Sequence, residues 1–343
     1  MKIAIDISPL SSAHRVRGVG FYLAHLKEAL DKTTKHEFIY FVEKAPDDVD
    51  LIHYPYFDPF SRSFSQKNDI PLVVTVHDLT PLVFPKHFPA GLRGNLNWQF
   101  NKFFLRSVSQ IITDSQCSAS DVSKYTGVAS KKITSIYLAA GKEFRPGPRH
   151  LELAKKYNIP TRFALYVGDV TWNKNLPRVI KAAEKVKLPL VLVGKAITEK
   201  DFVKSNPWNK DRIEVQALLK TAKNIHALGF VESEDLVKFY QTAEMLVMPS
   251  LYEGFGLPVV EAMQSGCPVV TSKEGSLGEV AGEAAYLVDA YSEDSIAEGI
   301  KMVFDSEKIR KELTEKGLKR AKEFSWDKTA TQTIAVYEKT ISH

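Results

Sequence analysis

Short apolar runs rich in β-branched residues alternate along the chain with segments of helical periodicity, and this rhythm starts afresh in the second half. The runs of the first half are Lys2–Ile7, Phe38–Val42, Leu72–Val76, Ile111–Thr113 and Ile133–Tyr137. Those of the second half are Phe163–Val167, Leu190–Val193, Ile225–Leu228, Met245–Met248, Val269–Thr271 and Ala285–Leu287. Apolar strands that alternate with helices form parallel sheets covered on both faces. We therefore predict an α/β fold of two doubly wound, Rossmann-like domains facing across a cleft.

The Pro- and Gly-rich segment Phe144–Arg149 is the predicted linker between the domains. A length of 343 residues agrees with two domains of ordinary size. The prediction assigns residues 1–147 to the first domain and 148–325 to the second. Residues 326–343 have a helical pattern and are expected to pack back on the first domain.

Charge and apolar patterning narrow the class of protein. The net charge is +5, and the surplus lies in the first half, but no RNA-binding motif or zinc finger accompanies it, so we expect no nucleic-acid partner. No apolar run approaches the ~20 residues that span a bilayer. Met1–Asp6 has the pattern of a strand rather than of a signal peptide, which favours a cytoplasmic protein. Cys117 and Cys267 are too few for a disulfide framework and are expected to be small core residues.

The most informative motif follows the predicted strand that ends at Met248. Gly254 and Gly256 keep the chain out of a helix and allow a ligand to approach, and Pro258 suits the start of a helix. The backbone amides of Phe255–Leu257 would then lie at a helix N-terminus, which is a natural phosphate site.

Two carboxylates flank this turn, Glu253 before the helix and Glu261 in its expected first turn. Carboxylates accept strong hydrogen bonds from sugar hydroxyls, so the pair suits a nucleotide sugar. The alternative is a simple helix cap, with Glu261 favouring the helix dipole and Glu253 solvated.

With these residues the chain resembles the retaining glycosyltransferases of family 4, which have the GT-B architecture and a Glu-x7-Glu signature matched by Glu253 and Glu261. The resemblance implies that Glu253 binds hydroxyls of the donor sugar and Glu261 the ribose. It also implies that Gly254, Phe255, Gly256 and Leu257 meet the sugar and the diphosphate. The second domain would then bind a nucleotide sugar, and the first would face the acceptor.

A second part of the donor site is expected after the strand Phe163–Val167. Gly168 permits a tight exit, and Lys174, next to Asn173, is predicted to begin a helix and to neutralise a diphosphate. A Lys at such a position is otherwise solvated surface. The resembled family commonly has Arg-x4-Lys here, and this chain departs from it because Asp169 stands at the Arg position.

Gly229, Phe230 and Val231 follow another predicted strand and resemble the nucleobase loop of the family. An ordinary strand-to-helix turn would look the same.

Gly18 and Gly20 lie between the first strand and the predicted helix Phe21–Leu30. Two glycines at such a turn can cradle phosphate, but the third glycine and the following acid of a dinucleotide site are missing, which disfavours a nicotinamide cofactor. The resemblance implies that this loop closes over the donor diphosphate. Arg17 or Arg15 could replace the cation lost at position 169.

His77 stands at the tip of the strand Leu72–Val76, where ligands of parallel sheets bind. The resemblance implies that His77 contacts the transferred sugar. Asp78 could orient its ring or cap the next segment.

The segment Leu92–Arg106 can be a helix on a membrane surface, or a core helix with a solvated basic edge, which we favour. Its aromatic residues are Trp98, Phe100, Phe103 and Phe104, and its basic residues are Arg93, Lys102 and Arg106.

Together with the resemblance, which implies retained anomeric configuration, these residues predict metal-independent transfer of a sugar to a glycan or lipid-linked acceptor, with His77, Lys174 and Glu253 at the reaction. No metal motif of the Asp-x-Asp kind ends a strand, and no cofactor is expected. The resemblance to bacterial mannosyl- and rhamnosyltransferases of surface polysaccharide synthesis favours GDP-mannose slightly over UDP-sugars. A non-catalytic nucleotide-sugar-binding protein and a nucleotide-sugar epimerase of similar architecture are the alternatives. Asp169, at the Arg position of the family, favours the non-catalytic binding protein, whereas the Glu253-x7-Glu261 signature disfavours the epimerase.

Overall fold

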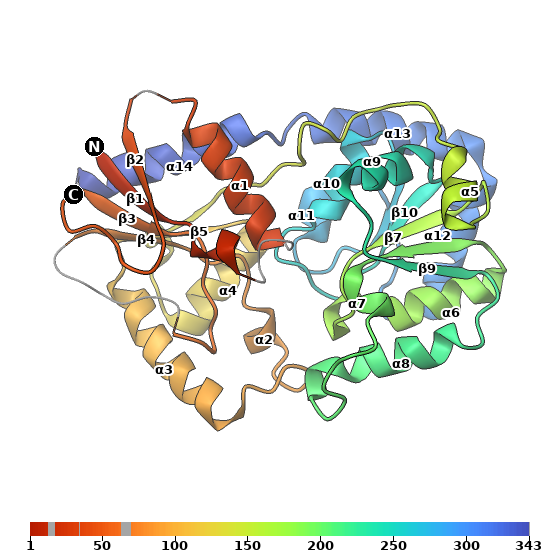
Figure 1. Ribbon diagram of the computed structural model, residues 1–343, viewed down its shortest axis with the longest axis horizontal. Helices are drawn as coiled ribbons and strands as arrows, with labels where there is room; N and C mark the ends of the chain where they lie inside the picture. Colours follow the sequence, from red (N-terminus) through yellow and green to blue (C-terminus); the bar gives the residue numbers. More distant parts are fainter. Residues whose placement is uncertain (13–17, 34, 63–69, 343) are drawn as a thin grey trace. The chain divides into compact units, whose positions relative to one another are not determined.

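The computed structural model describes residues 1–12, 18–33, 35–62 and 70–342 and divides into two compact units (Figure 1). Unit 1 comprises Met1–Ala139 and Phe324–His343, and unit 2 comprises Ala140–Glu323. The sequence placed the boundaries at 147/148 and 325/326. Arg15 and Arg17, the predicted substitutes for a missing cation, lie outside the described residues.

Unit 1 contains a six-stranded sheet in the order β2-β1-β3-β4-β5-β6, with every neighbouring pair parallel. Its strands are β1 (Lys2–Asp6), β2 (Glu37–Phe41), β3 (Leu51–Tyr54), β4 (Leu72–Thr75), β5 (Gln110–Thr113) and β6 (Ile133–Ser135). Its helices are α1 (Gly18–Leu30), α2 (Thr80–Val83), α3 (Gly91–Ser107), α4 (Gln116–Thr126) and α14 (Trp326–Ile341). Figure 1 shows α1 and α14 on one side of the sheet and α3 and α4 on the other.

Unit 2 repeats this architecture with a parallel sheet in the order β12-β11-β10-β7-β8-β9. Its strands are β7 (Ala164–Val167), β8 (Leu190–Val193), β9 (Ile225–Gly229), β10 (Met245–Met248), β11 (Val269–Thr271) and β12 (Tyr286–Leu287). Its helices are α5 (Glu152–Tyr157), α6 (Leu176–Val186), α7 (Lys195–Thr198), α8 (Lys210–Leu219), α9 (Ser233–Thr242), α10 (Leu257–Gln264), α11 (Leu277–Ala281), α12 (Glu293–Asp305) and α13 (Glu307–Ala321). The predicted pair of doubly wound parallel sheets is confirmed.

The core of each unit lies between its sheet and the covering helices. In unit 2 the buried strand residues pack against the apolar faces of α6 and α12, for example Val179 and Ile300. The residues of β4, β8 and β10 are all buried, which explains why these strands are apolar throughout. One strand, β3, was not predicted from the sequence.

Four short 3₁₀ turns complete the described part of the chain: Ser8–Ser11, Ser130–Lys132, Trp172–Lys174 and Pro207–Asn209. Within the described ranges no helix has the length and apolarity needed to cross a membrane. Of the two cysteines, Cys267 is buried as expected, whereas Cys117 is only partly buried.

Candidate active site

In unit 2 the strand order reverses between β7 and β10, which pair with each other and continue the sheet in opposite directions. Ligands of open parallel sheets bind at such a reversal, beyond the carboxyl ends of the strands. The loop after β7 carries Lys174, and the loop after β10 carries Glu253. The topology thus brings together two residues that lie 79 positions apart in the sequence.

Asparagine side chains hold these two loops together. The Asn173 side-chain amide donates to the carbonyl of Tyr252 at 3.0 Å, and the Asn173 carbonyl accepts from the amide of Leu251 at 2.7 Å. Asn175, which adopts a left-handed conformation with φ 59°, donates to the carbonyl of Pro249 at 2.9 Å. Both asparagines are buried, so the loops form one fixed support for the side chain between them.

That side chain, Lys174, forms a two-pronged ion pair with Glu253. Its Nζ lies 2.9 Å from Oε1 and 2.6 Å from Oε2 of Glu253. The side chain of Lys174 is 23% exposed and that of Glu253 is 8% exposed, so the lysine forms the accessible side of the pair. Lys174 ends the 3₁₀ turn Trp172–Lys174, and α6 begins two residues later, so the predicted helix start at Lys174 is wrong. The left-handed Asn175 separates the turn from the helix.

The turn into α10 has the expected form. Gly256 precedes the helix with φ 100°, and Pro258 is its second residue. A Cβ on Gly256 would lie 2.8 Å from Leu277, and one on Gly275 would lie 2.8 Å from backbone atoms of Glu253, so both positions require glycine. Pro258 has no N–H, and the amide of Val259 donates to the carbonyl of Gly256 at 2.9 Å, so Leu257 supplies the amide of this first turn that is suited to bind an anion.

Glu261 lies on the buried side of α10. It is the fifth residue of the helix, just beyond the predicted first turn, because the helix begins at Leu257. Burial raises the pKa of Glu261 to about 7, despite the hydrogen bond that Tyr240 donates to its Oε2 at 2.8 Å. Glu261 is therefore poised to change its charge near neutral pH.

Glycines mark the ends of the three strands beside this site. The amide of Gly168 donates to the carbonyl of Val193 at 3.0 Å, and the amide of Gly194 donates to the carbonyl of Gly229 at 2.7 Å. Gly229 ends β9 in a left-handed conformation with φ 72°. After it, Phe230 is 58% exposed while Val231 is buried, so only the aromatic ring is available for a planar partner.

In unit 1, His77 follows β4 and is held on both ring nitrogens. Its Nδ1 lies 2.7 Å from Oδ2 of Asp114, and its Nε2 lies 3.1 Å from the carbonyl oxygen of Pro55. The ring of Tyr22 packs edge-on against it at 4.8 Å between centroids. A carbonyl and an ionised carboxylate accept hydrogen bonds, so this environment favours a ring with protons on both nitrogens. Burial lowers the pKa of His77, but Asp114, with smaller contributions from Asp78 and the carbonyl of Pro55, raises it above its ordinary value, while burial also raises the pKa of Asp114.

Asp78 does not orient the ring. Its Oδ1 accepts a hydrogen bond from the amide of Thr80 at 2.8 Å, which is the capping alternative. Sequence reasoning missed Asp114, although this residue directly follows the buried strand β5 beside β4. A carboxylate at the carboxyl end of a buried strand is the signal that could have found it.

Gly18 and Gly20 lie in the first turn of α1 rather than in the loop before it, so the expected helix start at Phe21 is wrong. Helical hydrogen bonding extends three residues before the apolar periodicity begins, because the first turn needs no apolar face. Gly18 is exposed and Gly20 is buried.

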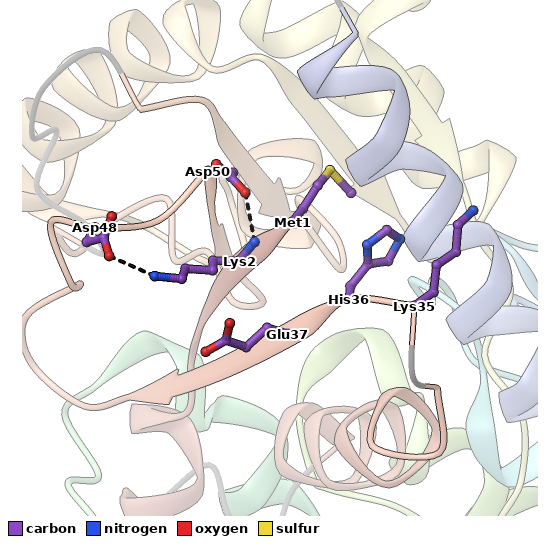
Figure 2. A pocket seen from close by; sticks show the side chains of 7 residues that line it. All are labelled: Met1, Lys2, Lys35, His36, Glu37, Asp48 and Asp50. Carbon is purple, nitrogen blue, oxygen red and sulfur yellow. Dashed lines mark hydrogen bonds and ion pairs between the residues drawn. The ribbon is translucent and has the colours of Figure 1, made fainter.

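A separate hollow lies at the opposite end of the unit 1 sheet, where β1 and β2 begin (Figure 2). Lys2 Nζ pairs with Asp48 at 2.8 Å inside the hollow, whereas Lys35 and His36 pair with Glu338 of α14. It contains none of the predicted site residues. Among the described residues no group of three or more His, Cys, Asp or Glu side chains could hold a metal ion.

Comparison with protein families matches both units. Residues 151–320 match the model described as glycosyl transferases group 1, and residues 14–139 match the model described as glycosyltransferase family 4. The Lys174–Glu253 pair lies within the first of these matches, and the His77–Asp114 pair lies within the second.

Two curated relatives illustrate the similarity. The O-antigen chain mannosyltransferase B of Escherichia coli is 31% identical over 78% of this chain and 70% of its own length. The serotype-specific mannosyltransferase WbdA of Escherichia coli is 27% identical over 84% of this chain. The alignment spans only 36% of the length of WbdA.

Solved structures share the fold at low identity. A sucrose-phosphate synthase from Thermosynechococcus elongatus has a TM-score of 0.77 at 19% identity, covering 100% of this chain and 99% of its own. HepE of Anabaena in complex with UDP and glucose has a TM-score of 0.75 at 16% identity, covering 99% of this chain and 100% of its own.

Proposed function

The chain belongs to glycosyltransferase family 4 and has the GT-B fold, and from this premise we propose that it transfers a mannose-like sugar from a nucleoside diphosphate sugar to a hydroxyl of a glycan or lipid-linked acceptor. The transfer retains the anomeric configuration and uses no metal. The observation that carries this proposal is the Lys174–Glu253 pair at the reversal of strand order, beside the turn into α10.

The donor diphosphate binds between Lys174 and the amide of Leu257 at the start of α10. The bond from the anomeric carbon to the β-phosphate oxygen breaks, and a bond from the same carbon to the acceptor oxygen forms. The acceptor proton passes to the departing phosphate oxygen. Negative charge builds up on the diphosphate, and the ammonium group and this amide stabilise it from fixed positions.

Carboxylates bind the two sugars of the donor. Glu253 accepts hydrogen bonds from hydroxyls of the transferred sugar, sharing its oxygens with Lys174, and Glu261 accepts hydrogen bonds from the ribose. Phe230 offers its exposed ring to the nucleobase, next to the backbone of Gly229 and Val231. Gly168 and Asn173 shape the loop that presents Lys174.

His77 acts through its charge and faces the transferred sugar. An imidazolium with both protons engaged does not take a proton from the acceptor, so general-base catalysis is not its role. Asp114 is a positioning residue that holds the ring and its charge. Gly18 and Gly20, at the start of α1, border the donor diphosphate.

GDP-mannose is the favoured donor because the relatives named above are mannosyltransferases. UDP-sugars are the second candidate, since HepE was solved with UDP and glucose. We place the protein in the cytoplasm, at the inner face of the membrane, where a lipid-linked acceptor is presented.

Incubation with labelled GDP-mannose or UDP-glucose, with and without a polyprenyl-linked acceptor, tests the proposal. We expect transfer from one donor, slow release of free sugar without acceptor, and an α-linked product from an α-linked donor. A donor that raises the melting temperature but stays intact would show that the chain binds nucleotide sugars without turnover, which is the alternative that Asp169 encourages.

The Asp169 side chain is engaged locally, since its Oδ1 accepts a hydrogen bond from the amide of the next residue, Val170, at 2.7 Å.

A further inference from the structure

Helix α3 carries an exposed apolar stripe along its outer face. Leu92 is 88% exposed, Leu96 73%, Phe100 46% and Phe103 75%. Positions that follow one another by four, four and three residues lie on one side of a helix, so these side chains form a continuous row. We call this row, together with the neighbouring basic residues Arg62, Arg93 and Lys102, the α3 surface. In Figure 1 the helix lies on the outer side of unit 1.

The exposure is not a sign of a loosely packed helix. The opposite face of α3 is buried in the core of unit 1 through Trp98, Phe104 and Leu105. Asn101 is 1% exposed, and its side-chain amide donates to the carbonyl oxygens of Asp58 and Ser61 at 3.1 and 2.8 Å. The helix is therefore fixed to unit 1 and presents the apolar row outward. The prediction that the aromatic residues of this helix lie in the core is confirmed for Trp98 and Phe104, which are buried, and is wrong for Phe100 and Phe103, which are exposed.

The charges carried by α3 itself have one sign. From Leu79 to Thr113 the sequence has no Asp or Glu but has Lys86, Arg93, Lys102 and Arg106. The guanidinium of Arg62 lies over the ring of Phe100, 4.9 Å from its centroid. A row of Leu and Phe on a helix whose charged side chains are all basic is complementary to a surface that is apolar inside and anionic at its rim.

We propose that the α3 surface docks on an anionic phospholipid bilayer. The Leu and Phe side chains enter the boundary between headgroups and acyl chains, and the basic residues contact lipid phosphates. A helix of 17 residues, about 25 Å long, lies flat on the bilayer in this geometry. The purpose of docking rests on the proposed function, since a lipid-linked acceptor resides in the same membrane.

Flotation of the full chain with phosphatidylcholine vesicles, with and without phosphatidylglycerol, tests the proposal. We expect binding that requires phosphatidylglycerol and weakens at high salt, because phosphate contacts are screened. Leu96→Glu with Phe103→Glu should weaken binding at least about tenfold. Arg93→Glu with Lys102→Glu should weaken it and remove most of its salt dependence.

The matched control is Leu151→Glu with Val203→Glu in unit 2. Leu151 is 57% and Val203 65% exposed, so the control adds the same two charges at exposed apolar positions outside α3. It should bind vesicles as the wild type does. The proposal would be overturned if this control lost as much vesicle binding as Leu96→Glu with Phe103→Glu. It would also be overturned if the wild type did not bind anionic vesicles.

Two further readouts separate this proposal from its rivals. Transfer to a soluble acceptor should be unchanged by Leu96→Glu with Phe103→Glu. A wild type that transfers sugar but does not bind anionic vesicles overturns the docking proposal alone. A wild type that binds vesicles but transfers no sugar would support the docking proposal and contradict the proposed function. If light scattering shows a dimer that these substitutions dissociate, and vesicles are not bound, then the α3 surface pairs with a second copy and the proposal is wrong.

Discussion

Two charged pairs at the candidate active site, Lys174–Glu253 in unit 2 and His77–Asp114 in unit 1, both follow parallel strands, yet their atoms are satisfied differently. Lys174 directs one flexible ammonium at Glu253 and keeps 23% of its side chain exposed. His77 has both ring nitrogens engaged, and the Asp114 side chain is 5% exposed. An exposed ammonium can share its three protons with an incoming phosphate, whereas a ring held on both sides is a fixed charge.

The difference shows how one fold can assign two roles to similar ion pairs. The pair in unit 2 is suited to exchange contacts with the donor, and the pair in unit 1 is suited to supply a constant field. Substitutions in unit 2 should therefore change transfer most, and substitutions in unit 1 should change its pH dependence.

The largest effect is expected from Glu253→Ala. Loss of hydrogen bonds to the transferred sugar should reduce kcat about 10³-fold, while nucleotide affinity stays measurable because Lys174 and α10 are unchanged. Steady-state kinetics and calorimetric titration with GDP measure the two quantities. Glu298→Ala, at an exposed position on α12, is the control and should be neutral. Unchanged turnover in Glu253→Ala would refute the role of this carboxylate.

Lys174→Met should reduce transfer about 10²-fold and also destabilise unit 2. It leaves the buried Glu253 without its counter-ion, at a cost of about 1–3 kcal/mol. Adding Glu253→Gln should restore stability in denaturant unfolding without restoring transfer. If the double variant is no more stable than Lys174→Met, then the pair is not the source of the loss.

Asp114→Asn should act through pH. The pKa of His77 is raised, so its favourable charge is fully present below the ordinary value of 6.5 and is lost as pH rises through the raised value. Without Asp114, burial is no longer outweighed, and the pKa should fall below 6.5. The alkaline limb of kcat against pH should then move to lower pH, with a loss of activity at neutral pH.

The comparison for this variant is Asp78→Asn, since Asp78 also raises the pKa of His77 but contributes less than Asp114. Of the other groups near the ring, Tyr22 packs against it. His53, whose pKa burial lowers to about 3, shares a hydrogen bond of 2.8 Å with Thr75. A larger shift from Asp78→Asn than from Asp114→Asn would reverse our assignment.

The smallest effect is expected at Glu261. Its folded pKa of about 7 lies above the ordinary 4.5, so its contribution to stability is present below 4.5 and is lost as pH rises through 7. The free energy of unfolding of the wild type should fall by about 1 kcal/mol relative to Glu261→Gln between about pH 6 and about pH 8. Parallel urea titrations of the two proteins measure this difference. Equal pH dependence would mean that Glu261 is ionised throughout.

The sequence predicts best where a local signal encodes the structure. The strand β10 and the turn into α10 were predicted because a buried apolar run, Gly256 and Pro258 specify them within a few residues. Lys174 and Glu253 were both predicted at the donor site, but their ion pair was not predicted, since it depends on the pairing of β7 with β10.

Other features could not be predicted because tertiary contacts decide them. The strand β3 is four residues long and contains His53, which is buried because Thr75 and Tyr337 satisfy both of its ring nitrogens at 2.8 and 2.7 Å. Asp114 was missed although its place after the apolar run Ile111–Thr113 is a local signal; only its pairing with His77, which follows β4, depends on tertiary contacts. On α3 the periodicity is apolar on both sides, and packing alone decides that Phe104 is buried and Phe103 exposed.

A crystal structure of the full chain with GDP or UDP bound tests the central claim most directly. We predict that diphosphate oxygens lie within hydrogen-bond distance of Lys174 Nζ and of the Leu257 amide that opens α10, with the ribose at Glu261. A nucleotide that binds elsewhere and makes no contact with Lys174 would contradict the account.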